Sequence, residues 1–563
     1  MNILLVHPYC LEKRIRDYDV KVVPIGLYYI GAVLKENGHN VEVLNLFDFQ
    51  NKKEQIQKIF EASRPNLIGF SVLQANRLGA AEIAGMAKKS MPETKVVFGG
   101  VAATYLWNHF LKHYPQVDYV VTGEGEHTLL ELVKALENES EPIEVEGLAW
   151  RNGQNLQINN PRPFVEDIDT LPNPAKYFCF QHVVSSRGCP WNCTFCGSPR
   201  FWKRNVRFHS PKYFVDQLEL LTQQGLNHFY VSDDTFTLKK DRVIQICKEI
   251  VIRGLDISWV AISRVNLVDE EILFWMRRAG CIQISYGVES GSKAIRKIFN
   301  KNITDHEIKR AFELTTRYGI LPRAYFIYGS PGENRSTIKA SIDLMKQIRP
   351  LSSVFYILDL FPGTALYDDF KKRCRVPDEI WLKPIEDIMY FETDPKLDEK
   401  SVLKFGAMLR EAFYKNLPRF VRKIKLVDNK ELYPAHADFL SRLALTFTHG
   451  EYASNDQIPG KDEVAKELFK KALKYHPVER AFLGLAIIYQ KEGKFEESIE
   501  ILKQGLDHFS ASPDLNSCIA LSFMNLGDTQ AALAHLQKFP DYRNNEELIK
   551  FCKGSIPTKS NQV

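Results

Sequence analysis

Three cysteines within eight residues form the most specific chemical feature of the chain. Cys189, Cys193 and Cys196 stand in the stretch Arg187-Gly188-Cys189-Pro190-Trp191-Asn192-Cys193-Thr194-Phe195-Cys196. A structural zinc site takes four nitrogen or sulfur ligands, typically as two pairs, and no second C-x-x-C pair follows here. Three thiolates on one loop instead suit a [4Fe-4S] cluster, which normally has four cysteine ligands. We therefore expect these cysteines to hold such a cluster with one iron open to another ligand.

The elements around the cysteines alternate between short strands and helices. The expected strands cover residues 182–186, 228–231, 258–262, 282–286, 324–328 and 353–358, with helices such as 211–224, 242–253, 270–279 and 306–318 between them. Six such units predict a partial or open barrel over residues 181–370, with its chemistry at the carboxyl ends of the strands. The cysteine loop directly follows the first of these strands. Gly188 and Pro190 let that loop bend tightly enough for three sulfurs to face one cluster.

The first 137 residues show the same alternation with a shorter period. The expected strands are 3–6, 41–44, 67–71, 95–98 and 118–121, and the intervening helices are 25–37, 54–63, 77–90, 104–113 and 126–136. This pattern predicts an α/β domain with a parallel, doubly wound sheet. Ligands of such sheets bind beyond the carboxyl ends of the strands. Ser71, Gly99-Gly100 and Gly123-Glu124-Gly125 lie at those ends, although such glycines equally serve tight turns. Thr128 replaces the third glycine of a dinucleotide fingerprint, which excludes a nicotinamide site.

The last region repeats with a period of 34 residues. The pairs at this offset are Tyr489 and Phe523, Gly493 and Gly527, Ser498 and Ala532, Leu502 and Leu536, Ala465 and Ile499, and Ala472 and Leu506. A period of 34 with small residues at helix-packing positions is typical of tetratricopeptide repeats, which are stacked helix pairs. We expect an all-α solenoid over residues 461–545.

Three other segments carry no motif. Residues 138–180 contain five prolines and are expected to be a connector, residues 371–460 to be helical and irregular, and residues 546–563 to be a polar tail. The basic stretch at Arg419, Arg422, Lys423 and Lys425 is interpreted as a solvated helix face.

Composition limits the class of protein. The chain has 563 residues, 45% of them hydrophobic and 25% charged, which excludes wholesale disorder. Its net charge of +5 gives no reason to expect a nucleic acid or a membrane surface as partner. The longest apolar run, residues 22–34, is shorter than the roughly 20 residues of a membrane span. We read no signal peptide, and clustered cysteines without an export signal indicate the reducing cytoplasm.

The seven other cysteines have no spacing that suggests ligation. Cys247, Cys281 and Cys518 fall in helical or strand-edge patterns and are expected to be small core residues. Cys179 lies ten residues before the first cysteine of the loop and is not expected to be a ligand.

The cysteine spacing, placed after the first strand of a six-unit barrel, resembles the radical S-adenosylmethionine (SAM) superfamily. In that family the open iron binds the amino and carboxylate groups of SAM. An electron from the reduced cluster then cleaves the C5′–S bond of SAM and produces a 5′-deoxyadenosyl radical. The resemblance thus implies two cofactors, the cluster and SAM.

Five further features match the family in chain order. Phe195 matches the aromatic residue between the second and third cysteines, which lies near the adenine. Asp233 lies in Val231-Ser232-Asp233-Asp234-Thr235-Phe236, which looks like the Asp-Asp-x-Phe end of the second strand. Glu289 and Ser290 lie in Ser285-Tyr286-Gly287-Val288-Glu289-Ser290-Gly291, which is similar to the fourth-strand motif that approaches the ribose and the methionine moiety.

The last two motifs follow the fifth and sixth strands. Gly329 and Pro331 lie in Tyr328-Gly329-Ser330-Pro331-Gly332-Glu333-Asn334, which resembles Gly-x-Pro-Gly-Glu-Thr with Asn334 in place of the usual Thr. Residues 360–367 match the Pro-Gly-Thr turn. The resemblance implies SAM contacts at Phe195, Asp233, Glu289, Ser290, Gly329 and Pro331.

The first region looks like the cobalamin-binding domain found ahead of many radical SAM enzymes. The resemblance is carried by Pro24-Ile25-Gly26-Leu27, Gly38-His39-Asn40-Val41, Gly69-Phe70-Ser71, Gly99-Gly100 and Gly123-Glu124-Gly125-Glu126. It implies corrinoid contacts at Ser71, Gly99, Gly100, Glu124 and Gly125. Asn45 stands where the family often carries Asp, and the Asp-x-His-x-x-Gly motif of the methionine-synthase type is absent. We therefore expect no axial histidine, and His7 is interpreted as a polar loop residue.

The resemblance implies a cobalamin-dependent radical SAM enzyme that removes a substrate hydrogen and transfers a methyl group from methylcobalamin to carbon. Relatives that catalyse ring formation or rearrangement leave a cyclase as the alternative. Methylthiotransferases need three cysteines in the first domain, and only Cys10 lies in residues 1–137. An interaction protein with a vestigial site is disfavoured by the complete cysteine triplet.

The partners follow from the same reading. We expect an electron donor of the flavodoxin or ferredoxin type and a small-molecule, peptide or carrier-bound substrate. The repeat region predicts a protein partner or self-association. No general acid or base can be assigned from the sequence, and the catalytic residues stay unknown.

Overall fold

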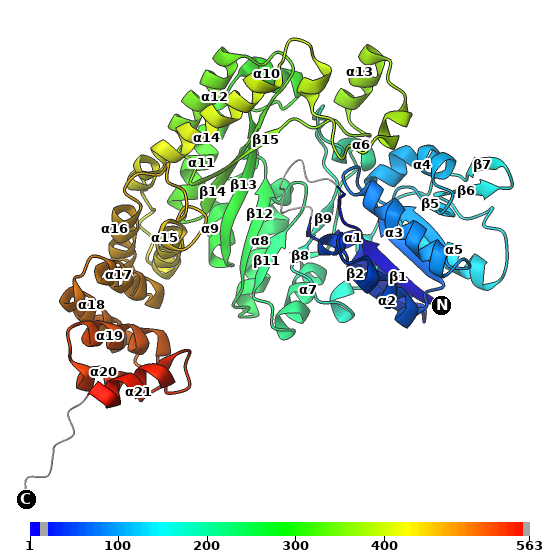
Figure 1. Ribbon diagram of the computed structural model, residues 1–563. Helices are drawn as coiled ribbons and strands as arrows, with labels where there is room; N and C mark the ends of the chain where they lie inside the picture. The colour runs from blue at the N-terminus through cyan, green and yellow to red at the C-terminus, as the bar shows by residue number, and fades with distance from the viewer. Residues whose placement is uncertain (12–20, 556–563) are drawn as a thin grey trace, which may run out of the picture.

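The protein is described here by a computed structural model covering residues 1–11 and 21–555, with an N-terminal α/β unit, a central barrel and a C-terminal helical region (Figure 1). The first sheet has the strand order β2-β1-β3-β4-β5-β6-β7, and β1 to β5 pair in parallel. Its strands are β1 (Asn2–His7), β2 (Asn40–Asn45), β3 (Leu67–Ser71), β4 (Lys95–Gly99), β5 (Tyr119–Val121), β6 (Leu148–Asn152) and β7 (Asn155–Ile158).

Four helices connect the parallel strands, and a fifth leads from β5 to the antiparallel β6. The helices are α1 (Ile25–Glu36), α2 (Lys53–Ser63), α3 (Arg77–Ser90), α4 (Val101–His113) and α5 (Glu126–Glu137). The predicted doubly wound sheet is therefore confirmed. Residues 3–6 of β1 are all buried, as expected for a parallel strand that is covered on both faces.

The segment predicted as a connector contains secondary structure of its own. Strands β6 and β7 form an antiparallel hairpin that extends the first sheet beyond β5. All five prolines of this segment lie outside the two strands. Leu148 and Trp150 are buried against the sheet, whereas Gly153 supplies a positive φ of 59° in the turn.

The central unit is a six-stranded parallel sheet in the order β15-β14-β13-β12-β11-β8, which confirms the predicted partial barrel. The predicted strand 182–186 divides in two: its first part enters the barrel as β8, and Ser186–Arg187 forms β9, which pairs antiparallel with β10. The strands are β8 (His182–Val183), β9 (Ser186–Arg187), β10 (Arg207–Phe208), β11 (His228–Val231), β12 (Ser258–Ser263), β13 (Cys281–Glu289), β14 (Leu321–Tyr328) and β15 (Ser352–Ile357).

The helices of the barrel begin at residues that satisfy free backbone N–H groups. Ser210, Asp269, Thr304 and Asn334 each accept a hydrogen bond from the first turn of the following helix. These caps fix where each strand-to-helix connection ends. The helices are α6 (Ser198–Phe201), α7 (Pro211–Gln223), α8 (Lys240–Ile252), α9 (Glu270–Arg278), α10 (Lys293–Ile298), α11 (Asp305–Arg317), α12 (Arg335–Ile348) and α13 (Ala365–Cys374).

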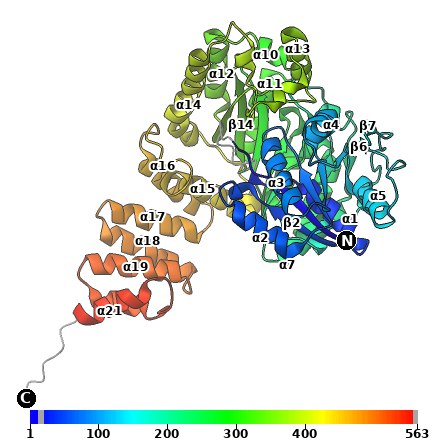
Figure 2. The same cartoon turned by 45° about the vertical axis from the view of Figure 1, so that its right-hand side comes forward.

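The C-terminal region is helical and extends away from the two sheets (Figures 1 and 2). The predicted polar tail is wrong from residue 546 to 555, because helix α21 lies there with Cys552 fully buried, while residues 556–563 lie outside the described part. The helices are α14 (Glu399–Arg422), α15 (Tyr433–Thr448), α16 (Lys461–Leu473), α17 (Glu479–Lys491), α18 (Phe495–His508), α19 (Pro513–Asn525), α20 (Thr529–Leu536) and α21 (Asn545–Ser555).

The basic residues on α14 and the cysteines expected in the core lie where the sequence predicts. Arg422 pairs with Glu467 on the surface of α14, as expected for a solvated helix face. Cys247, Cys281 and Cys518 are buried core residues, as predicted. Within residues 1–11 and 21–555, no helix is long and apolar enough to span a membrane.

The N-terminal unit packs against the barrel near both of its edge strands. Near β8, Arg187 bonds Glu124 and Glu126 of the first unit. Near β15, Gln74 Nε2 donates to Asp359 Oδ2 at 3.2 Å, and Arg77 donates to backbone carbonyls of residues 381–385. The carboxyl ends of both sheets therefore face a shared interior.

Candidate functional site

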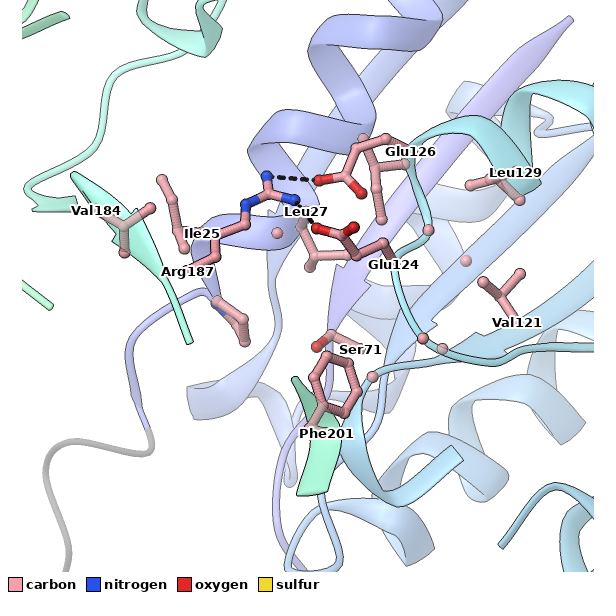
Figure 3. Close-up of a pocket in the computed structure, with 18 of the residues that line it drawn as sticks. Ile25, Leu27, Ser71, Val121, Glu124, Glu126, Leu129, Val184, Arg187 and Phe201 are labelled. Atoms are coloured by element: carbon pink, nitrogen blue, oxygen red, sulfur yellow. Dashed lines mark hydrogen bonds and ion pairs between the residues drawn. The ribbon is translucent and has the colours of Figure 1, made fainter. Parts of the chain in front are cut away.

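A cavity of about 310 Å³ lies between the first sheet and the barrel. Figure 3 shows its lining, with Ser71, Val121 and Glu124 on one side and Val184 and Arg187 on the other. All five residues predicted as corrinoid contacts line it: Ser71, Gly99, Gly100, Glu124 and Gly125. The structure thus brings together strand ends that are far apart in the sequence, which is where a ligand of an α/β sheet is expected.

The cavity is lined mainly by apolar side chains and by glycines at the strand ends of the first sheet. Its side chains include those of Ile25, Leu27, Val121, Leu129 and Val184. Gly100 has a φ of 94°, and a Cβ there would lie 3.0 Å from the carbonyl oxygen of Val72, so the position requires glycine. Ligand pockets span roughly 300–1,000 Å³, so this cavity fits an apolar part of a molecule as large as cobalamin. The residues present fit the implied corrinoid.

His7 and Asn45 do not line this cavity. The prediction of a loop position for His7 is wrong, because His7 is the last residue of β1, is fully buried, and stacks on Phe47 with 6.3 Å between the ring centroids. Asn45 donates to the carbonyl of Lys21 and accepts from the N–H of Phe47, so it shapes the loop after β2.

The cysteine loop lies between β9 and α6, beside the cavity. Its three cysteines are half-buried. The loop is held by the segment after α10: Thr194 N–H donates to the carbonyl of Phe299 at 3.1 Å, and Asn300 Nδ2 donates to the carbonyl of Asn192 at 2.8 Å. On its other side, Arg264 places its guanidinium over the ring of Trp191, 4.5 Å from the centroid.

The environment of the loop favours the protonated form of Cys189 and Cys196 when no metal is bound, because burial raises the pKa of both thiols. Burial raises the pKa of Cys196 to about 12, and neighbouring Asp234 and Cys193 act in the same direction. A bound metal reverses this preference, because its positive charge stabilises thiolates. Within the described ranges no three His, Cys, Asp or Glu side chains converge on a point for a single metal ion. That is compatible with a cluster, in which each thiolate binds a different iron.

The start of the loop requires glycine. Gly188 has a φ of 103°, and a Cβ there would lie 2.0 Å from the carbonyl oxygen of Asn205. This close approach brings the segment before β10 against the residue that precedes Cys189. The two ends of the cysteine-bearing segment are therefore in contact.

Phe195 belongs to the cysteine loop, and Glu289 is bonded to the segment that holds this loop. Phe195 packs edge-on against Phe299 with 4.9 Å between centroids. Glu289 ends β13 with a positive φ of 62°, and its buried carboxylate pairs with Lys301 Nζ at 2.7 Å. Lys301 belongs to the same segment that holds the cysteine loop. Ser290 is fully buried and contacts the hydroxyl of Ser341.

Two adjacent aspartates at the end of β11 have different environments. Asp233 is buried and accepts from Ser185 N–H, Ser185 Oγ and Ser186 Oγ, so both of its oxygens are used within the protein. Asp234 instead lines the cavity and accepts from Ser198 Oγ at 2.7 Å. Burial raises the pKa of both carboxyls. The SAM contact predicted for Asp233 stays a prediction, while Asp234 is the aspartate that faces open space.

The turn after β14 is stabilised from within. Glu333 is buried and accepts from the N–H groups of Gly329 and Ser330. Burial raises its pKa to about 7, although these two hydrogen bonds act in the opposite direction. Asn334 caps α12 by accepting from the N–H groups of Ser336 and Thr337, which explains why Asn replaces Thr without loss of the turn. Pro331 stands between these residues in the same turn.

A buried ion network, not anticipated from the sequence, joins the cavity to the cysteine loop. Arg187 lies between Glu124 and Glu126, and Arg207 bonds the second oxygen of Glu124 (Figure 3 shows the first two pairs). Burial alone would raise the pKa of Glu124, but the hydrogen bonds and charges of the two arginines outweigh it and hold the pKa below its usual value. Both oxygens of Glu124 are occupied by the protein.

The residues that sequence reasoning missed are cationic: Arg187, Arg207, Arg264 and Lys301. The three arginines contact groups far away in the chain, and Glu124 is separated from Arg207 by 83 positions, whereas Lys301 lies 12 positions from Glu289. No local spacing identifies such pairs. Arg187 adjoins the cysteine motif, and that adjacency is the one signal that was available.

Two protein-family models match the chain. The radical SAM superfamily model matches residues 183–345, and the B12 binding domain model matches residues 14–133. These ranges fall within the two α/β units described above. They also contain the cysteine loop and most of the strand ends that line the cavity.

The chain is also similar to individual proteins. An uncharacterised methyltransferase of Pyrococcus horikoshii is 32% identical over 456 residues, which is 78% of this chain and 97% of that protein. The anaerobic magnesium-protoporphyrin IX monomethyl ester cyclase of Cereibacter sphaeroides is 27% identical over 402 residues, 67% of this chain and 65% of that protein. The structure of TsrM from Kitasatospora setae, a radical SAM methyltransferase with cobalamin and a [4Fe-4S] cluster bound, has a TM-score of 0.60 at 18% identity. It covers 84% of this chain and 99% of TsrM, and at that identity the likeness is one of fold.

Proposed function

The chain belongs to the cobalamin-dependent radical SAM methyltransferase family, and on that premise we propose that it methylates a carbon atom of a substrate bound between its two α/β units. The cofactors of the family are a [4Fe-4S] cluster, SAM and cobalamin. One observation carries the proposal: a single cavity is lined by the glycine-rich strand ends of the first sheet and by the residues that start the cysteine loop.

Each part of the site has a role in this proposal. Cys189, Cys193 and Cys196 would hold the cluster, and the lining formed by Ser71, Gly99, Gly100 and Gly125 would contact the corrinoid. When bound, the cluster supplies the electron that cleaves SAM, and the corrinoid supplies a transferable methyl group. The protein positions these groups and keeps water out with the apolar side chains of the cavity.

The proposed SAM contacts lie around the cysteine loop. Phe195 would face the adenine, and Glu289 with Ser290 the ribose and methionine moiety. Lys301 fixes the Glu289 carboxylate before any ligand arrives. Gly329 and Pro331 would contact SAM through the turn that Glu333 stabilises, and Asp233 would act by holding the end of β11.

The proposal is tested at Gly99, which lines the cavity. A Cβ at this position would meet only Val121 and the carbonyl of Phe70, at 3.8 and 3.9 Å, so Gly99→Val adds volume without backbone strain. We expect the variant to retain cobalamin at least about tenfold more weakly than wild type, as about 1.4 kcal/mol of lost affinity would produce. The measurement is absorption after desalting of protein reconstituted without oxygen with iron, sulfide and hydroxocobalamin.

A matched control separates this effect from a general cost of valine. Gly85→Val lies in α3, away from the cavity, with no atom within 4 Å of the new Cβ. It should bind cobalamin as wild type does. Equal retention by Gly99→Val, Gly85→Val and wild type would contradict the assignment of the cavity.

A cyclase is the second candidate, favoured by the likeness to the magnesium-protoporphyrin cyclase. The two reactions differ in their products. A methyltransferase consumes SAM as both radical source and methyl source, whereas a cyclase consumes it only as radical source. Methyl groups labelled in SAM that appear in the product would favour methylation. An electron donor of the flavodoxin or ferredoxin type is proposed for either reaction.

The C-terminal helices are proposed to be tetratricopeptide repeats that bind a protein partner or associate with themselves. Positions 34 apart have matching environments: Gly493 and Gly527 follow α17 and α19 with φ of 72° and 82°. Ser498, Ala532, Leu502 and Leu536 are all fully buried. Gly493→Ala and Gly527→Ala should each cost about 1–2 kcal/mol, since both have open space and positive φ. Unequal costs in thermal unfolding would argue against a repeat, and sedimentation velocity reports self-association.

A further inference from the structure

The cysteine loop is closed at its base by a pair of short strands. Strands β9 and β10 pair antiparallel, with Arg187 opposite Arg207 and Ser186 opposite Phe208. Residues 188–206 connect them and carry all three cysteines. The positions of Arg187 and Arg207 therefore fix where the cysteine-bearing segment begins and ends.

One carboxylate of the N-terminal unit holds both of these positions. Glu124 Oε1 accepts from Arg187 Nη1 at 2.6 Å, and Glu124 Oε2 accepts from Arg207 Nη1 at 2.7 Å. Glu126 adds a second contact to Arg187, with 2.7 Å between Oε1 and Nη2 (Figure 3). The side chains of Glu124, Glu126 and Arg207 are 4–6% exposed, and that of Arg187 is 8% exposed.

The network is buried, and its charges compensate one another. Two arginines face two glutamates, so the buried charges balance. The Arg187 guanidinium also lies over the ring of Tyr29 at 4.9 Å, and that of Arg207 over Phe164 at 4.8 Å. Glu124 Oε2 accepts a further hydrogen bond from the N–H of Val165 at 2.9 Å. Because buried charges lack the screening of water, removal of one leaves its partner uncompensated.

The same residues form a wall of the cavity. Glu124, Glu126 and Arg187 all line it, and Gly188 continues the lining to the first cysteine. A ligand in the cavity therefore packs against the group that holds the base of the cysteine loop. A ligand in the cavity and a cluster on the cysteine loop would both act on this network. Two ligands that act on one element influence each other's affinity reciprocally, so binding at either site is expected to change binding at the other.

We infer that Glu124 is a positioning residue that holds both ends of the cysteine loop from the N-terminal unit and thereby couples cobalamin binding to the cluster. This inference rests on the proposed function for the identity of the two cofactors. The sequence predicts that Glu124 contacts the corrinoid directly. In this inference the Glu124 carboxylate instead bonds two arginines of the protein. The carboxylate acts through Arg187 and Arg207.

The test measures coupling in the full-length protein. Hydroxocobalamin affinity is determined with and without the reconstituted cluster, and the EPR spectrum of the dithionite-reduced cluster is recorded with and without hydroxocobalamin. We expect wild type to show at least a fivefold difference between the two affinities, about the lower end of known couplings. Glu124→Gln keeps the shape of the side chain and removes its charge. It should reduce the difference to less than about twofold and abolish the response of the EPR spectrum to hydroxocobalamin.

Two further variants keep the test decisive. Glu131 lies on α5, the helix that begins at Glu126, and pairs with Arg162 outside the cavity, so Glu131→Gln should behave as wild type. Glu126→Gln leaves the bonds of Glu124 to Arg187 and Arg207 in place and weakens only the second contact to Arg187. It should therefore weaken the coupling by about half. If Glu124→Gln fails to fold, as judged by circular dichroism, the outcome for Glu126→Gln decides: unchanged coupling there would overturn the inference.

The remaining outcomes separate this inference from the proposed function. Wild type that binds hydroxocobalamin equally with and without the cluster would overturn the coupling and leave the methyltransferase proposal intact. Wild type that binds no hydroxocobalamin in either state would overturn both. Glu124→Gln with wild-type coupling and an unchanged EPR response would show that the carboxylate serves the fold alone.

Discussion

Gly188→Ala tests whether the closed base of the cysteine loop is needed for the cluster. The residue has a φ of 103°, where an alanine costs about 1–2 kcal/mol. Its new Cβ would also lie 2.0 Å from the carbonyl oxygen of Asn205, about 1 Å closer than real Cβ atoms approach. Relieving this overlap moves the backbone before β10 and costs about another 1–3 kcal/mol, as overpacking does. The total is about 2–5 kcal/mol.

The assay compares Gly188→Ala with Gly225→Ala. Gly225 has a similar φ of 91° in the same barrel, but no atom lies within 4 Å of the added Cβ, so this control carries the cost of φ alone. The unfolding midpoint of Gly188→Ala without cluster should lie lower than that of the control, by about 2–4 °C for each kcal/mol of difference. Iron and sulfide content after reconstitution should fall in Gly188→Ala and stay normal in the control. Equal midpoints and a full cluster in both would refute the reasoning.

Three other predictions concern the cluster and its surroundings. Cys193→Ala should abolish the cluster and all cleavage of SAM while the N-terminal unit stays folded, and formation of 5′-deoxyadenosine at the wild-type rate would contradict the assignment. Glu289→Ala should cost about 3–5 kcal/mol because it leaves Lys301 buried without its partner, whereas Glu289→Ala with Lys301→Met should regain stability but not SAM affinity. Recovery of SAM affinity in that double variant, measured by equilibrium dialysis, would mean that Glu289 is structural. Burial raises the pKa of Glu333 from 4.5 to about 7, so the folded protein keeps this carboxyl protonated to higher pH than the unfolded chain does. The stability that this proton contributes is therefore present below pH 4.5 and is lost as the pH rises to 7. That loss is about 3 kcal/mol at most, and the pH dependence of the unfolding midpoint should flatten between pH 4.5 and 7 in Glu333→Gln.

Strands β1 and β3 were predictable because each contains a run of consecutive buried residues, as parallel strands covered on both faces do. Helix α3 has the bounds expected from its pattern, and β3 and β11 begin and end where predicted. The cysteine motif was equally clear, since its ligands lie on one loop. These features share one property: the information is local in the chain.

The hairpin of β6 and β7 was missed because its partner is distant. Strand β6 is short and pairs with β5, which lies almost thirty positions earlier, and prolines flank the hairpin on both sides. Composition therefore favoured a connector. The division of 182–186 has a similar cause, because β9 is defined by pairing with β10 across the whole cysteine loop.

The adjacent Asp233 and Asp234 show a further limit. At the end of a strand, successive side chains point to opposite faces, so one of the two must point inward. The sequence does not state which one. Asp233 is the inward residue, held by Ser185 and Ser186, and Asp234 is left beside the cavity.

Glu124 shows why a motif residue at a strand end need not contact the ligand. A carboxylate has a limited number of acceptor positions, and those of Glu124 are taken by two arginines and a backbone N–H. Gly99 and Gly100 do the opposite, because they leave space at the same sheet edge. The charges of Glu124 and its two arginines therefore pair within the protein. Apart from Asp234 and a few serines, the surface offered to a ligand is glycine backbone and apolar side chains. Such a surface favours an uncharged, apolar part of the cofactor. Removing the charge of Glu124 should therefore change cofactor affinity by shifting the cavity lining, and not by removing an attraction between the carboxylate and the cofactor.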